Sequence, residues 1–184
     1  YSLEPDWGEL CESIASKARK EEIPVIKRET GALLKTMVAL KQPRAILEVG
    51  TAVGYSALLM AGAAPESCKI TTIEKYEPRI LEAKKNFAKA EIEDRIVLLE
   101  GDAEEILQSL TGPFDFVFLD AAKGQYLHWL PVILGLLERG GVLFSDNVLQ
   151  GGDVLQSRYG VERRDRTIHG RRREYLYEIK HAEG

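Results

Sequence analysis

The chain has 184 residues, of which 45% are hydrophobic and 29% are charged, and its formal net charge is −4. This length fits one compact domain, and the composition excludes a disordered chain, a collagen-like chain and a coiled-coil rod. The acidic balance also disfavours a protein that binds nucleic acid over its whole surface. Cys11 and Cys68 belong to no CxxC or His/Cys cluster, which favours a reducing, cytoplasmic compartment over a zinc site or a disulfide scaffold. No apolar stretch is long enough to span a bilayer, so no membrane partner is expected.

Short β-rich segments alternate with longer helical segments along the chain. Two helices are predicted first, over residues 6–21 and 29–40. Five strands follow, over residues 45–49, 69–74, 95–100, 114–119 and 141–145. Helices are predicted between them, from about residue 55 and over residues 78–90, 103–109 and 126–137. A last helix is predicted from about residue 163 to residue 181.

This alternation predicts an α/β fold with a parallel sheet and helices on both of its faces. The strands are short, apolar and rich in β-branched or aromatic residues, as is typical of strands that are buried on both faces. Ligands of such open sheets bind beyond the carboxyl ends of the strands. The residues that follow each strand are therefore the candidate binding residues.

The first three strand ends carry residues that suit a nucleoside. Gly50 and Gly54 follow the first strand and allow a tight turn that a ligand can approach closely, although such turns also occur without a ligand. The segment lacks the G-x-G-x-x-G pattern of a dinucleotide site. Glu74 ends the second strand, where a carboxylate can accept hydrogen bonds from both hydroxyls of a ribose or simply be solvated. Asp102 follows the third strand and either accepts the amine of an adenine or caps the next helix.

The fourth and fifth strands end in oxygen-bearing side chains. Asp120 follows the fourth strand, and Asp146 and Asn147 follow the fifth. Carboxylate and amide oxygens without His or Cys suit Mg²⁺, Mn²⁺ or Ca²⁺ better than zinc, although Asp-Asn can also be an ordinary turn. Lys123 lies three residues after Asp120. A loop lysine is usually only solvated, but beside a metal its pKa could fall far enough for a general base.

Five motifs then occur in the order of one known family and span roughly residues 23–148. They are residues 48–56 (EVGTAVGYS), 72–74 (TIE), 101–103 (GDA), 118–123 (FLDAAK) and 145–148 (SDNV). With them the chain resembles the cation-dependent S-adenosylmethionine (SAM) O-methyltransferases, which include catechol and caffeoyl-CoA O-methyltransferases. Residues 120–126 (DAAKGQY) and the Arg-rich segment after the fifth strand are most similar to a bacterial branch that methylates 5-hydroxyuridine at the wobble position of tRNA.

The resemblance implies a Rossmann-like class I methyltransferase fold with the sheet order 3-2-1-4-5. It implies one domain over residues 1–184, in which residues 1–42 form the lid or substrate side. Residues 43–148 then form the cofactor and metal core, and residues 149–184 form an Arg-rich loop and helix. Family members usually continue into a C-terminal antiparallel hairpin, which the sequence does not contain. Either this segment has been lost or left out, which we expect, or the fifth strand is an exposed edge, which would favour aggregation. A homodimer is also expected by resemblance.

The resemblance further implies a role for individual residues. Lys123 is the expected catalytic base, and Mg²⁺ (or Mn²⁺ or Ca²⁺) is expected on Asp120, Asp146 and Asn147. Ser56 is expected to bind the methionyl carboxylate of SAM, Glu74 its ribose and Asp102 its adenine. The complete set of expected SAM contacts is Ile26, Glu48, Gly50, Ser56, Glu74, Asp102, Ala103 and Asp120.

The expected reaction moves a methyl group from SAM to a substrate oxygen whose pKa is lowered by Mg²⁺. Catechol and 5-hydroxyuridine both offer two adjacent oxygens, so the metal site cannot distinguish them. Residues 158–173 contain seven arginines against two acidic residues, a local charge of +5 that leaves −9 in the remainder. Because arginine suits phosphate, we expect tRNA as the substrate, contacted by Arg163, Arg164 and Arg166.

Three alternatives to the hypothesis of a tRNA methyltransferase remain open. The arginines can form a solvated helix face, and such charge runs usually do. The substrate can be a small catechol-like or phenolic metabolite. The chain can also be a nucleotide-binding module without activity, but Lys123 and the three predicted metal ligands argue against that.

Overall fold

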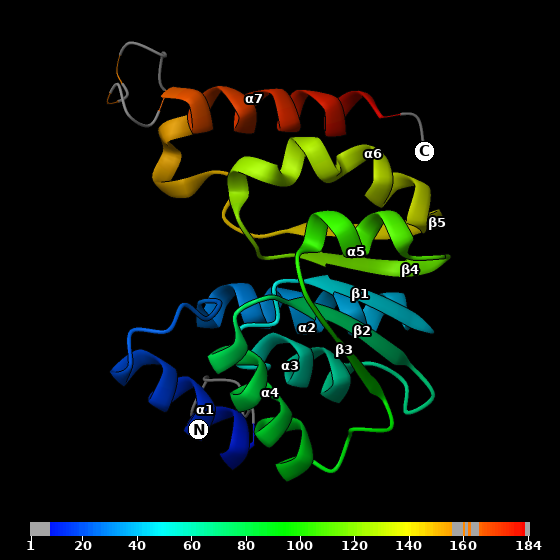
Figure 1. The fold of residues 1–184 in the computed structure, drawn as a ribbon. Coiled ribbons are helices and arrows are strands. Elements are labelled where there is room, and N and C mark those ends of the chain that lie inside the picture. The colour runs from blue at the N-terminus through cyan, green and yellow to red at the C-terminus, as the bar shows by residue number, and fades with distance from the viewer. Residues whose placement is uncertain (1–7, 156–159, 161, 163–165, 183–184) are drawn as a thin grey trace.

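The computed structural model describes residues 8–155, 160, 162 and 166–182 (Figure 1). Two helices come first, α1 (Glu9–Lys20) and α2 (Arg28–Lys41). The strands are β1 (Ala45–Val49), β2 (Lys69–Glu74), β3 (Ile96–Glu100), β4 (Phe114–Leu119) and β5 (Leu137–Ser145). The other helices are α3 (Tyr55–Ala63), α4 (Glu77–Lys89), α5 (Ala103–Ser109), α6 (Tyr126–Leu136) and α7 (Arg166–His181). Two short 3₁₀ helices, η1 (Lys123–Gln125) and η2 (Gln150–Leu155), complete the described elements.

The strands form one parallel sheet in the order β3-β2-β1-β4-β5, which confirms the predicted α/β fold and strand order. Helices α1 to α4 cover one face and α5 to α7 cover the other (Figure 1). Neighbouring strand residues point to opposite faces, so Ile46 packs in the first hydrophobic cluster and Leu47 in the second. All six residues of β4 are buried, as expected for a central strand covered on both faces. This packing holds the carboxyl ends of the five strands at one edge of the sheet.

The fifth strand differs most from its prediction. It begins at Leu137, four residues before the predicted start at residue 141, and α6 accordingly ends at Leu136. Leu137 pairs with Phe114, and the register then shifts so that Val142 pairs with Phe116. Gly140 has a φ of 76° within this irregularity, a conformation that few other residues adopt. The Gly140-Gly141 pair in the sequence does not by itself predict a β-bulge at this position, so the early start of β5 is not predicted.

The remaining predicted elements lie within a few residues of the observed ones. The described part of α7 begins at Arg166, and residues 163–165 of the predicted helix lie outside the described residues. In the described part of the chain the sheet has five strands, with β5 paired to β4. No helix in that part is both long and apolar enough to cross a membrane. The division into lid, core and Arg-rich segment stays a prediction.

Candidate functional site

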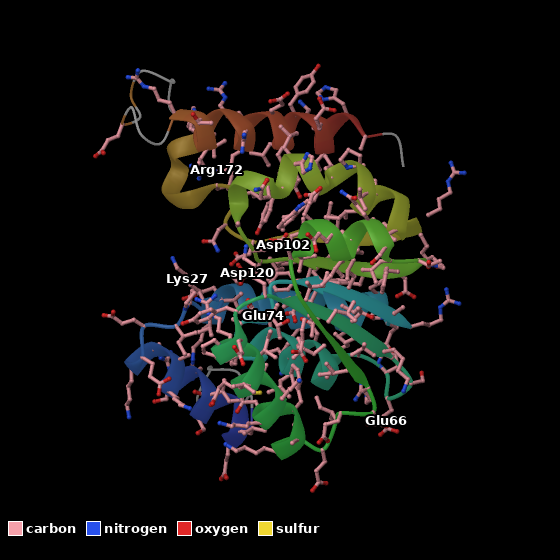
Figure 2. All side chains as sticks on the ribbon, viewed as in Figure 1. Lys27, Glu66, Glu74, Asp102, Asp120 and Arg172 are labelled. Atoms are coloured by element: carbon pink, nitrogen blue, oxygen red, sulfur yellow. The ribbon has the colours of Figure 1, made fainter. Side chains whose placement is uncertain are left out.

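A cavity of about 910 Å³ lies at the carboxyl edge of the sheet. Residues at or just after the ends of all five strands line it, among them Gly50, Glu74, Asp102, Asp120 and Asp146. Figure 2 shows Glu74, Asp102 and Asp120 at this edge together with Lys27, which precedes α2, whereas Glu66 lies at the far end of the strands. The expected contacts Ile26, Ala103 and Asn147 also line the cavity. The topology therefore brings together eight residues that the sequence singled out separately.

The Gly50 turn is packed against the end of β4. Gly50 has a φ of 107°, and a Cβ atom on it would lie only 2.3 Å from the carbonyl oxygen of Asp120. The backbone N–H groups of Gly50 and Thr51 both donate to the carbonyl of Ile73, each at 3.1 Å. Only glycine fits this position, because the backbone conformation and the close approach both exclude a side chain.

Glu74 is held by three backbone donors at the end of β2. One carboxylate oxygen accepts from Ala52 N–H at 2.9 Å, and the other accepts from Lys75 and Tyr76 N–H at 2.9 and 3.0 Å. The residue is 8% exposed and lines the cavity. Its carboxylate is thus fixed in place, and it has room for a further hydrogen bond because two oxygens offer about four acceptor positions.

Asp102 is the N-cap of α5, as one of the two alternatives for this residue predicted. Its carboxylate accepts from Glu104 N–H at 2.9 Å and lies 3.2 Å from the Lys75 ammonium. The backbone hydrogen bond and the lysine both lower the pKa of Asp102. The cap does not exclude an adenine contact, because Asp102 also lines the cavity.

Sequence reasoning missed a polar cluster beside Asp102. Glu104 accepts from the Trp129 indole at 2.8 Å and binds His128 Nε2 at 2.9 Å. Both partners come from α6 and line the cavity, and Trp129 is 6% exposed. The hydrogen bond with His128 and, after it, that from Trp129 lower the pKa of Glu104. Since Glu104 and Trp129 lie 25 positions apart in the chain, no local motif signals this contact.

Three oxygen-bearing residues line the cavity at the ends of β4 and β5, on the other side of β1 from Glu74 and Asp102. They are Asp120, Asp146 and Asn147, which the sequence predicted to lie close together. Asp120 follows β4, and the Asp146 N–H donates to the carbonyl of Leu119 at 2.9 Å, which keeps the two strand ends together. Asn147 donates its backbone N–H and its side-chain amide to the Asp146 carboxylate. Among the described residues no group of three or more His, Cys, Asp or Glu side chains could hold a metal ion. Asp120, Asp146 and the side-chain oxygen of Asn147 together offer two carboxylates and one amide oxygen, a hard donor set of the kind that suits Mg²⁺.

Glu48 and Ser56 are not among the described residues that line the cavity. Glu48 is fully buried and accepts from the Ser56 hydroxyl and the Thr72 hydroxyl, each at 2.5 Å. Thr51 and Thr72 share a further hydrogen bond of 2.6 Å. Burial raises the pKa of Glu48 to about 7, against the opposing effect of the two hydroxyl donors. A SAM contact from Glu48 or Ser56 stays a prediction.

The predicted base and tRNA contacts are only partly described. The backbone of Lys123 begins η1, but its side chain lies outside the described residues. Arg163 and Arg164 also lie outside them, whereas Arg166 begins α7 and is half-buried. Of the other α7 arginines, Arg172 is 4% exposed and lies on the α6 side of the sheet (Figure 2). Burial removes Arg172 from any phosphate-binding surface.

Comparisons with known proteins agree with this arrangement. The model of the O-methyltransferase family matches residues 6–174. A catechol O-methyltransferase of Mycobacterium tuberculosis (strain ATCC 25618 / H37Rv) is 34% identical over 138 residues, which cover 73% of this chain and 62% of that protein. A caffeoyl-CoA O-methyltransferase of Populus kitakamiensis is 33% identical over 133 residues, 70% of this chain and 57% of that protein.

A solved structure is similar over nearly the whole chain. It is that of the O-methyltransferase TomG from Streptomyces achromogenes in complex with SAM. It superposes with a TM-score of 0.82 at 30% identity, covering 95% of this chain and 79% of TomG. The chain spans about three fifths of the length of the curated relatives that it matches. The family match and the shared fold together establish that this chain belongs to the O-methyltransferase family that includes the catechol and caffeoyl-CoA enzymes.

Proposed function

We propose that the chain is a SAM- and Mg²⁺-dependent O-methyltransferase that methylates one of two adjacent oxygens on a small catechol-like substrate. The observation that carries the proposal is the meeting of all five strand ends at one cavity, with Glu74 on one side and Asp120, Asp146 and Asn147 on the other. The names of the curated relatives and the SAM bound to TomG support the cofactor and the substrate class.

The residues of the cavity fit SAM. A cavity of about 910 Å³ accommodates a nucleoside with its amino-acid tail and still leaves room for a small substrate. Glu74 supplies a fixed carboxylate acceptor for ribose hydroxyls, and the missing side chain at Gly50 lets the ligand approach the backbone of the turn. Ile26, Ala103 and Trp129 supply apolar surface for the adenine and the methionine chain. Asp120 supplies a negative charge for the methionyl amine.

The residues also fit a divalent cation, which Asp120, Asp146 and Asn147 would hold. When bound, SAM supplies the methyl group and the cation lowers the pKa of the substrate hydroxyl that accepts it. Lys123 follows Asp120 by three positions and begins η1, so it is the proposed base that takes the hydroxyl proton on its Nζ. The walls of the cavity hold the two reactants together, which supplies much of the rate by orientation alone.

A second candidate substrate is 5-hydroxyuridine in tRNA. The observation that favours it is the local charge of +5 over residues 158–173. Two features weaken it: Arg172 is buried, and Arg171 donates to the carbonyl of Gly124 at 3.2 Å, so these arginines already have roles within the protein. For this reason the small substrate is preferred.

Methyl transfer from labelled SAM tests the proposal. The substrates are a catechol, the matching phenol with a single hydroxyl, and bulk tRNA from cells that lack wobble uridine methylation. We expect turnover of the catechol and little of the phenol, because only the catechol offers two adjacent oxygens. Label in tRNA without turnover of the catechol would overturn the small-substrate proposal in favour of tRNA. No transfer to any of the three would overturn both.

A further inference from the structure

Two buried tyrosines from different helices meet behind the cation side of the cavity. Tyr126 begins α6 and Tyr175 lies in α7, and each is 1% exposed. Their ring centroids are 5.6 Å apart at an interplanar angle of 58°. Both rings belong to the hydrophobic cluster on the α5 to α7 face of the sheet.

Each tyrosine hydroxyl binds the last residue of a strand. Tyr126 donates to the carbonyl of Leu119 at 3.0 Å, and the Tyr175 hydroxyl lies 2.5 Å from the hydroxyl of Ser145. Leu119 and Ser145 are direct partners in the register of β4 and β5. The two tilted, packed rings therefore connect two paired strand ends.

The residues that follow these two strand ends are Asp120 and Asp146. The Leu119 carbonyl accepts two hydrogen bonds, one from Tyr126 and one from the Asp146 N–H at 2.9 Å. This single oxygen thus connects α6, β4 and the turn that carries Asp146.

Packing alone does not account for the hydroxyl groups. Phenylalanine would fill the same space in this apolar cluster, and a buried tyrosine hydroxyl is costly unless it finds a partner. Both hydroxyls find such a partner, since Tyr126 donates to the Leu119 carbonyl and Tyr175 shares a hydrogen bond with the Ser145 hydroxyl. In both cases the partner is the residue immediately before a proposed cation ligand.

We propose that Tyr126 and Tyr175 are positioning residues that fix Asp120 and Asp146 at the separation a divalent cation requires. This role rests on the proposed cation site. It also gives α7 a function: Tyr175 binds the end of β5, and Arg171 holds η1, which carries Lys123, through the carbonyl of Gly124. The helix that contains the arginines is thereby joined to the catalytic edge of the sheet.

Cation affinity measured without substrate tests this role. Mn²⁺ binding is followed by electron paramagnetic resonance for the wild-type protein, Tyr126→Phe and Tyr175→Phe. The matched control is Tyr177→Phe, because Tyr177 also lies on α7 but is 61% exposed. Affinity for S-adenosylhomocysteine and the melting temperature are measured on the same samples. We expect Tyr126→Phe and Tyr175→Phe each to weaken Mn²⁺ binding by roughly tenfold, as is usual for residues that orient metal ligands. The affinity for S-adenosylhomocysteine should stay unchanged.

Ser145→Ala provides a second route, because it removes the partner of Tyr175 and leaves both rings in place. Ser145→Ala should weaken Mn²⁺ binding as Tyr175→Phe does. The double variant Ser145→Ala/Tyr175→Phe should bind Mn²⁺ no more weakly than either single variant, because both substitutions remove the same hydrogen bond. Equal Mn²⁺ affinity in Tyr126→Phe, Tyr175→Phe and Tyr177→Phe would overturn the positioning role, even if the melting temperatures differ. Failure of the wild-type protein to bind Mn²⁺ would overturn the cation site itself, and this role with it.

Discussion

Glu48 and Thr72 are direct partners in the register of β1 and β2, and the Thr72 hydroxyl donates to the Glu48 carboxylate at 2.5 Å. The Ser56 hydroxyl binds the other carboxylate oxygen. A fully buried carboxyl group thus lies in β1, two residues before Gly50, and its register partner on the other side, Phe118 of β4, is apolar. Because burial favours the neutral carboxylic acid, this group makes stability depend on pH.

The contribution of Glu48 to the stability of the protein should fall as the pH rises from about 4.5 to about 7. The pKa of Glu48 is raised from 4.5 to about 7 in the folded state, so over this range the folded state binds more protons than the unfolded state. The free energy of unfolding then decreases with pH, by up to about 3 kcal/mol for a shift of this size. Glu48→Gln should remove this dependence, because the amide does not titrate.

Urea unfolding of both proteins between pH 5 and pH 8 measures the effect. Glu66→Gln serves as the control, since Glu66 is exposed and lies at the far end of the strands (Figure 2). The control should keep the wild-type dependence on pH. A constant difference in stability between wild type and Glu48→Gln over the whole range would contradict a raised pKa at Glu48.

Gly50→Ala should destabilise the protein and weaken SAM binding together. The added Cβ atom would lie 2.3 Å from the carbonyl oxygen of Asp120, and the φ of 107° is unfavourable for alanine. Overpacking of this kind typically costs about 1–3 kcal/mol of unfolding free energy. Gly62→Ala is the matched control, because Gly62 lies in α3 with open space around it, so alanine there should be neutral or stabilising. Thermal unfolding and calorimetric titration with SAM give both results, and unchanged values for Gly50→Ala would refute the close packing of the turn.

Glu74→Gln should weaken the binding of SAM and leave the protein folded, although the amide nitrogen cannot accept the backbone hydrogen bond of the oxygen it replaces, which should cost about 1–3 kcal/mol of stability. The amide keeps the shape of the side chain but replaces a charged acceptor, and hydrogen bonds to charged groups contribute about 1.5–3 kcal/mol, roughly a ten- to hundredfold change in Kd. Glu100→Gln is a close control, since Glu100 is the register partner of Glu74 on β3 but its side chain is 50% exposed. If both variants bind SAM as the wild-type protein does, Glu74 is not a cofactor contact.

Lys123→Met should lower kcat and leave the affinity for SAM unchanged. A positioned general base commonly contributes about a hundredfold to ten-thousandfold in rate, and methionine keeps the length of the side chain without a titratable group. The residual activity of the variant should rise with pH as the substrate ionises on its own. Lys84→Met is the control, because Lys84 pairs with Glu100 on the surface. A kcat within a factor of a few of the wild-type value would exclude Lys123 as the base.

Much of the site could be predicted because its residues follow strands in a parallel sheet. In that arrangement the carboxyl ends meet at one edge, so Glu74, Asp102, Asp120 and Asp146 converge whatever the details of packing. Thr72 could have been recognised as well. It is a polar residue at the level of Glu48 in the neighbouring buried strand, and a buried carboxyl group needs such a partner.

Other features depend on contacts that no local pattern encodes. The hydrogen bond between Ser145 and Tyr175 joins residues 30 positions apart, and that between Trp129 and Glu104 joins residues 25 apart. The early start of β5 follows from a register shift against β4 rather than from its own sequence. The buried Arg172 belongs to a run of arginines whose composition predicts an exposed surface, and only the packing of α7 on α6 separates it from its neighbours.

Dependence of methyl transfer on a divalent cation tests the central claim most directly. The wild-type protein is freed of metal with EDTA, and transfer of label from SAM to a catechol is measured as Mg²⁺ is returned. Asp146→Ala is measured beside it at the same SAM saturation. The account predicts no transfer without metal, recovery with Mg²⁺ in the wild-type protein, and no recovery in Asp146→Ala. Full transfer in the presence of EDTA, or equal recovery in Asp146→Ala, would contradict it.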